Sequence, residues 1–129
     1  MSAELNVVIA IENVWNKFLL SPLEFARYID EFDSPYVRAY FDIGNCIITG
    51  YAQHWIQILK KRIVKLDVKG FKRNGYKWVN LLDGDVNWPA VRRALDEIGY
   101  TGWLTAELKG GDEHYLTDLA KRMDRIIEM

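Results

Sequence analysis

Residues 37–45 read Val-Arg-Ala-Tyr-Phe-Asp-Ile-Gly-Asn, a β-branched and aromatic run that leads into an acid and a turn. This composition predicts a strand at residues 37–41, with Asp42 at its carboxyl end. Comparable runs recur three more times along the chain, at residues 6–11, 63–68 and 102–107. The first of them contains an unbroken apolar stretch, and such stretches are typical of strands that are buried on both faces of a parallel sheet.

Helical patterns separate these strands. Ser21, Pro22 and Glu24 predict a helix that runs to about Phe32, because the serine can cap it, the proline fits its first turn and the glutamate can close a capping box. Further helices are expected at residues 53–61, 87–98 and 113–128. In the last of these, the residues expected to face inward are Leu116, Leu119, Met123 and Ile126.

The remaining segment, residues 70–86, has few periodic apolar residues and is expected to be a long loop. Trp88 and Trp103 are expected to pack in the core. Strands that alternate with helices predict parallel pairing through right-handed crossovers. The expected fold of residues 1–129 is therefore a single α/β domain of four βα units with a parallel sheet.

Composition excludes several classes of protein. The 129 residues fit one domain, and 17 basic against 18 acidic residues leave a net charge of -1, so no nucleic-acid partner is expected. Cys46 is the only cysteine, which excludes an internal disulfide and fits a reducing compartment. No apolar run could cross a bilayer, and residues 1–6 lack the pattern of a signal peptide. We therefore expect a cytoplasmic protein without membrane contact.

Each predicted strand ends in or just before an acid, and these acids are Glu12, Asp42, Asp67 and Glu107. They are separated by about the length of a βα unit, so all four are expected at one rim of the sheet, where α/β proteins bind ligands. Clustered carboxylates repel one another unless a cation lies among them, and oxygen ligands suit Mg²⁺ or Mn²⁺. The alternative is that each acid only caps the loop that follows its strand.

At these residues the chain resembles the sugar phosphate isomerase/epimerase superfamily, the xylose isomerase-like barrels. The resemblance rests on five pieces in order, at residues 9–13, 41–45, 62–69, 84–88 and 99–107. It implies that the chain corresponds to the C-terminal half of a (β/α)8 TIM barrel, since the pieces match its last four βα units. A complete barrel needs about 250 residues.

The resemblance also implies a metal centre. Three of the family's metal ligands fall on Glu12, Asp42 and Glu107, and its histidine ligand falls on Asp67, where this chain departs from the pattern. The resemblance further implies a reaction, the isomerisation or epimerisation of a sugar or sugar phosphate through an enediolate. Glu12 and Glu107 would be its acid–base pair. The residues expected to contact the substrate are Trp15, Asn45, Lys69 and Arg73. Core packing is the alternative for Trp15, and a solvated loop is the alternative for Lys69 and Arg73.

Two other functions stay open. One is a catalytically inactive half-barrel that acts as a scaffold or interaction protein. The other, less favoured, is metal-dependent cleavage of phosphodiesters, as in the type-2 apurinic endonucleases that belong to the same superfamily. Those enzymes use several metals and more histidine ligands, whereas this chain has only His54 and His114. Four parallel strands leave two open edges, so we expect a homodimer or pairing with another half-barrel. Activity is expected to need the missing half.

Overall fold

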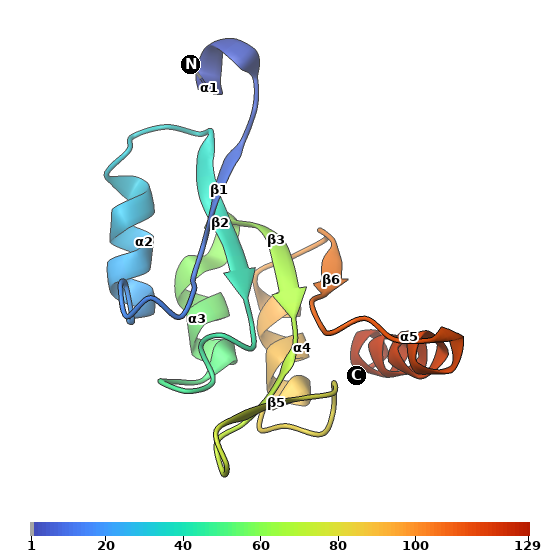
Figure 1. Ribbon diagram of the computed structural model, residues 1–129. Coiled ribbons are helices and arrows are strands. Elements are labelled where there is room, and N and C mark those ends of the chain that lie inside the picture. Colours follow the sequence, from blue (N-terminus) through green and yellow to red (C-terminus); the bar gives the residue numbers. More distant parts are fainter. Residues whose placement is uncertain (1) are drawn as a thin grey trace.

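The computed structural model describes residues 2–129 and confirms the expected α/β fold (Figure 1). Its centre is a four-stranded sheet in the order β1-β2-β3-β6, and every neighbouring pair is parallel. The strands are β1 (Ile9–Glu12), β2 (Val37–Asp42), β3 (Ile63–Val68) and β6 (Leu104–Ala106). Parallel order places the carboxyl ends of all four strands at the same rim.

Helices α2 (Pro22–Asp30), α3 (Ala52–Leu59) and α4 (Trp88–Glu97) lie next to one another and cover one face of the sheet (Figure 1). The core lies between these helices and the sheet, and Phe41, Ile56 and Leu66 are fully buried in it. Along β2, buried residues alternate with the half-buried Arg38 and Tyr40. These two side chains therefore point to the opposite face of the sheet. Among residues 2–129, no layer of helices covers that face (Figure 1).

The remaining elements lie at the ends of this core. The short helix α1 (Ser2–Leu5) precedes β1, the 3-10 turn η1 (Lys60–Arg62) leads into β3, and α5 (Glu113–Ile127) contacts α4. Ile126 is fully buried, as expected, but the expectation that Leu116 faces inward was wrong, because its side chain is 52% exposed. No helix among residues 2–129 combines the length and apolar character that crossing a membrane requires.

The segment expected to be a plain loop contains a hairpin. Strands β4 (Gly70–Lys72) and β5 (Lys77–Val79) pair antiparallel, with Phe71 opposite Trp78. Phe71 is fully buried, and a side chain at Gly84 would overlap the Phe71 backbone, so the glycine lets the end of the loop pack against the hairpin. This packing depends on contacts between distant residues, which the local sequence pattern does not reveal.

Both edges of the sheet are open in the described part of the chain. Ile9, at the β1 edge, is 52% exposed, and Val7 and Val8 before it are also exposed. Trp103, which precedes the β6 edge, is 83% exposed, so the expectation that it packs in the core was wrong, whereas Trp88 is buried as expected. Trp103 is exposed because the sheet ends at β6, so no further strand or helix packs against its side chain in the described part of the chain. The architecture is that of a half-barrel.

Asparagine 87 caps helix α4: its Oδ1 accepts a hydrogen bond from the backbone N–H of Ala90 at 3.1 Å. Replacing Asn87 by alanine removes this acceptor and is expected to lower the free energy of unfolding by about 0.5–2 kcal/mol. Urea denaturation followed by circular dichroism measures the change. The matched control is Asn87→Ser, which keeps a capping oxygen and is expected to retain most of the stability. Equal losses in both variants would contradict the capping role.

Candidate functional site

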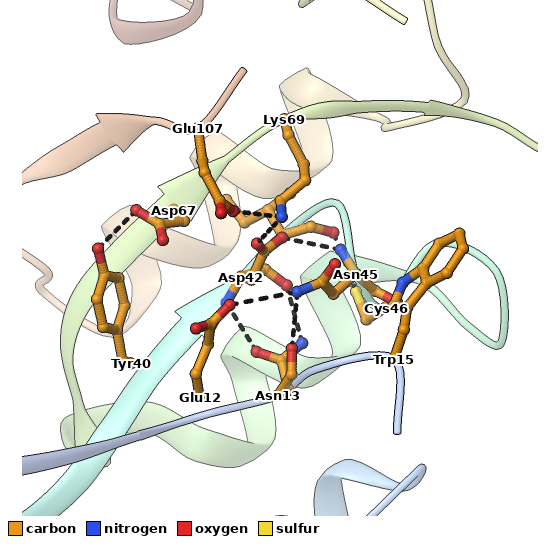
Figure 2. A network of polar contacts seen from close by, with 11 residues as sticks. Glu12, Asn13, Trp15, Tyr40, Asp42, Asn45, Cys46, Asp67, Lys69 and Glu107 are labelled. Carbon is orange, nitrogen blue, oxygen red and sulfur yellow. Dashed lines mark hydrogen bonds and ion pairs between the residues drawn. The ribbon is translucent and has the colours of Figure 1, made fainter. Parts of the chain in front are cut away.

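The four acids that end the strands converge on one point at the rim of the sheet (Figure 2). Each offers one carboxylate oxygen, and these oxygens all lie within 4.8 Å of one another. Asp42 and Asp67 come from the two central strands and are paired in register. Glu12 ends the edge strand β1, and Glu107 directly follows the edge strand β6. The structure therefore brings together the residues that sequence reasoning proposed as a metal site.

Asp42 lies at the bottom of this cluster, fully buried. Its backbone exchanges two hydrogen bonds with the Asn13 side chain, at 2.7 and 2.9 Å, and its Oδ1 accepts one from the backbone N–H of Asn45 at 2.8 Å. Its other oxygen, Oδ2, accepts no hydrogen bond of good geometry, although Lys69 Nζ lies 2.8 Å away. Burial raises the pKa of Asp42 to about 7, against the opposing effects of Lys69 and the Asn45 N–H.

Lys69 places its ammonium between two of the acids. Nζ forms ion pairs with Asp42 Oδ2, at 2.8 Å, and with Glu107 Oε2. Burial lowers the pKa of Lys69, but the two carboxylates together outweigh this effect and hold it above its usual value. In turn, the hydrogen bond from Lys69 lowers the pKa of Glu107. The ammonium thus favours the ionised form of Glu107.

Glu12 and Asp67 form no ion pair in the described part of the chain and are held by neutral donors instead. Glu12 Oε1 accepts a hydrogen bond from Asn45 Nδ2 at 3.3 Å, and Asp67 Oδ1 accepts one from the Tyr40 hydroxyl at 2.7 Å. Burial, followed by the nearby charge of Glu107, raises the pKa of Glu12. The cluster therefore contains one carboxylate with a lowered pKa and two with raised ones.

Besides Lys69, two of the expected substrate-contact residues lie beside the acids. Asn45 bonds to Glu12, and its backbone carbonyl accepts a hydrogen bond from Trp15 Nε1 at 3.1 Å. The Trp15 ring lies 39% exposed against the hairpin, 4.7 Å from the Trp78 ring and 5.2 Å from the Phe71 ring. Trp15 is therefore neither a core residue nor free of contacts: it forms part of an aromatic wall next to the acid cluster.

Arg73 lies elsewhere. Its Nε and Nη2 donate to the carbonyls of Ile47 and Gly50, at 2.8 and 2.7 Å, and its guanidinium lies 5.0 Å from the centre of the Tyr51 ring. It forms no hydrogen bond or ion pair with any of the four acids among residues 2–129. Arg73 therefore connects the hairpin to the loop after β2 through these hydrogen bonds. Contact between Arg73 and a substrate stays a prediction.

A cavity of about 510 Å³ opens beside the acids, between the hairpin and the start of α5. Lys69 and Glu107 lie on its wall, together with Trp78, Asn80, Lys109 and Tyr115. Sequence reasoning did not single out Trp78 or Tyr115, nor Asn13 and Tyr40, which hold Asp42 and Asp67. Tyr40 could have been found from its spacing, since it lies two residues before Asp42 on the same strand.

The donor set fits a divalent cation. Four carboxylates supply only oxygen atoms, which hard ions such as Mg²⁺ and Mn²⁺ prefer. The fully buried Asp42 Oδ2 accepts no hydrogen bond of good geometry, and the charged group next to it is the Lys69 ammonium at 2.8 Å. A metal held by Glu12, Asp42, Asp67 and Glu107 would supply a second positive partner for this oxygen.

Comparison with known proteins agrees with the geometry. Xylose isomerase-like TIM barrels match residues 1–128 of the chain. Similar solved structures include a D-tagatose 3-epimerase-like protein, with 18% identity, a TM-score of 0.80 and coverage of 98% of this chain and 49% of the other. A xylose isomerase domain protein from Planctomyces limnophilus has 23% identity and a TM-score of 0.76, with coverage of 99% and 49%.

A third structure, a 3-keto-D-glucoside 4-epimerase from E. coli, has 14% identity and a TM-score of 0.76, with coverage of 99% of this chain and 48% of the other. No curated protein is significantly similar in sequence. The chain thus spans about half the length of the barrels it matches, as the sequence-based resemblance implied. Taken with the parallel sheet, the family match over nearly all residues shows that the chain belongs to the xylose isomerase-like TIM barrels.

Proposed function

We propose that the chain supplies the metal- and proton-handling half of a sugar isomerase or epimerase. The observation that carries this proposal is the convergence of Glu12, Asp42, Asp67 and Glu107 within 4.8 Å at the carboxyl rim of a parallel sheet. The structural neighbours named above as epimerases support sugars as the substrate class. A bound Mn²⁺ or Mg²⁺ would supply Lewis-acid polarisation of a substrate carbonyl.

Proton transfer is the part of the chemistry assigned to this chain. Glu12 and Glu107 come from opposite edges of the sheet and approach the cluster from its two ends. In the proposed step, Glu107 acts as an ionised carboxylate and takes the proton from the carbon next to the carbonyl. The C–H electron pair moves into the enediolate. Glu12 enters the step protonated and returns its proton, and the face or carbon that it protonates decides between epimer and isomer.

The other half of the barrel is part of the proposal. The open edges β1 and β6 would each pair with a strand from four further βα units, provided by a second copy or by another half-barrel. Two copies would place two acid clusters at the same rim, and bound cations would be needed to offset their repulsion. The phosphodiesterase alternative gains no support, since the exposed His54 and His114 lie outside the described carboxylate cluster.

Proton exchange tests the function directly. The assembled particle, of measured mass and loaded with Mn²⁺, is incubated with ketohexoses in D₂O, and deuterium at the carbons next to the carbonyl is followed by NMR. We expect metal-dependent incorporation, because reversible deprotonation by a carboxylate exchanges that hydrogen with solvent. The same particle treated with a chelator is the control. If the metal-loaded particle incorporates no deuterium, the chain is a scaffold and the enzymatic proposal fails.

A further inference from the structure

Lys69 lies inside the proposed metal site. Its Nζ contacts Asp42 Oδ2 and Glu107 Oε2, which belong to two of the four carboxylates that would hold a metal, and its side chain is only 13% exposed (Figure 2). The ammonium is also the only group that forms ion pairs with the four acids in the described part of the chain. A lysine thus supplies positive charge at a point where a divalent cation would bind.

The loop after β2 determines the path of the Lys69 side chain. A methyl group added at Gly44 would overlap Cγ of Lys69 and lie 2.9 Å from the Lys69 carbonyl oxygen. Gly44 is buried, and it follows Asp42 by two residues. Only a residue without a side chain leaves this channel open, so the aliphatic part of Lys69 is guided towards Asp42 by the same loop that positions Asp42.

The ammonium also lies near an aromatic ring while it is paired with the two acids. Nζ is 5.0 Å from the centre of the Trp78 ring, a distance at which an aromatic face attracts a cation. Lys69, Trp78 and Glu107 share the wall of the cavity of about 510 Å³. The cavity gives the lysine head room to leave the acids without unfolding its surroundings.

We propose that Lys69 is an internal counter-cation: it neutralises Asp42 and Glu107 in the metal-free protein and turns towards Trp78 and the cavity when a divalent cation binds. The inference rests on the metal site of the proposed function. An ammonium and a divalent cation that share two carboxylates would repel each other strongly at such short range. The free energy of metal binding therefore includes the cost of breaking two ion pairs, which lowers the affinity for the metal. The metal-free arrangement, with Lys69 paired to both carboxylates, is favoured to the same extent.

Metal affinity tests the competition. Mn²⁺ binding is measured by calorimetry on the assembled protein for the wild type, Lys69→Met and Lys65→Met. We expect Lys69→Met to bind Mn²⁺ about 10- to 100-fold more tightly, the size of effect that groups in contact with metal ligands typically have. Lys65 is the matched control. Its Nζ lies 4.8 Å from the centre of the Tyr40 ring beside the cluster but pairs with no carboxylate, so its loss tests charge removal alone.

Movement of the lysine has its own readout in the wild-type protein. Acetylation of Lys69 is quantified by mass spectrometry with and without Mn²⁺, and the exposed Lys72 serves as the internal standard. We expect Mn²⁺ to increase the labelling of Lys69 several-fold relative to Lys72, because the reagent reaches an amino group released into the cavity more readily than one enclosed between two carboxylates.

The outcomes separate the two proposals. Mn²⁺ binding by the wild type, with unchanged labelling and equal affinity in Lys69→Met, would overturn the counter-cation role and leave the metal site standing. Equal gains in Lys69→Met and Lys65→Met with unchanged labelling would also overturn it, since net charge alone would explain them. Binding by Lys69→Met but not by the wild type would support it. If neither protein binds Mn²⁺, both the metal site and the role of Lys69 fail.

Discussion

Replacing Glu107 by glutamine in the assembled, metal-loaded barrel is expected to lower kcat by about 10²- to 10⁴-fold, the range that a positioned acid or base contributes. An amide keeps the size of the side chain but can neither accept nor return a proton. The same loss is expected for Glu12→Gln, because the reaction needs both members of the pair. The rate is measured with the ketose that the deuterium-exchange experiment identifies.

A matched control separates catalysis from a general loss of charge. Glu24 lies exposed in the first turn of α2, on the helical layer of the half-barrel, so Glu24→Gln is expected to leave kcat unchanged. Circular dichroism shows whether each variant is folded. Wild-type rates in either Glu12→Gln or Glu107→Gln would remove the acid–base pair from the mechanism, even if Mn²⁺ binding were intact.

The second large effect is expected in the core. Phe41 is fully buried in β2, one residue before Asp42, and its ring stacks on that of Trp55, with centroids 5.6 Å apart and an interplanar angle of 7°. Phe41→Ala is expected to lower the free energy of unfolding by about 3–5 kcal/mol, because it removes a large buried ring and leaves a cavity. Urea denaturation measures the loss, which is a large part of the total stability of about 5–15 kcal/mol that is usual for a domain.

Phe18 provides the comparison for Phe41. Its ring is 57% exposed, although it contacts the Tyr28 ring edge-on, so Phe18→Ala is expected to cost about 1 kcal/mol or less. If both alanine variants lost the same stability, the layer between β2 and α3 would not be the main core. A large loss confined to Phe41→Ala would show that the layer between β2 and α3 is the main core.

The sequence predicted the fold best where strands are central. Residues 63–68 were expected as a strand and form one, because β3 has neighbours on both sides and its apolar run is buried. The edge strands are shorter than expected: residues 6–11 were predicted, but β1 is Ile9–Glu12, and Val7 and Val8 are exposed. Their apolar pattern fits a sheet with a further neighbour, which the described chain does not contain.

The site could be predicted in part, for a geometric reason. Parallel strands bring their carboxyl ends to one rim, so the positions of Asp42 and Asp67 follow from strand assignment alone. The path of Lys69 could not be predicted, because it depends on the space above Gly44 and on where Glu107 reaches after β6. Arg73 was equally inaccessible to sequence reasoning, since its donors are engaged by backbone carbonyls of a loop far away in sequence.

The two unpaired strands of the sheet differ from each other, and this affects how copies of the chain can associate. A contact that joins β1 of one copy to β6 of the next is head-to-tail, and repeated contacts of this kind form a closed ring or an open filament. The curvature of the sheet determines whether a ring or a filament results. Substitutions that flatten the four strands would therefore favour fibres over a discrete particle, even at positions remote from the exposed backbone.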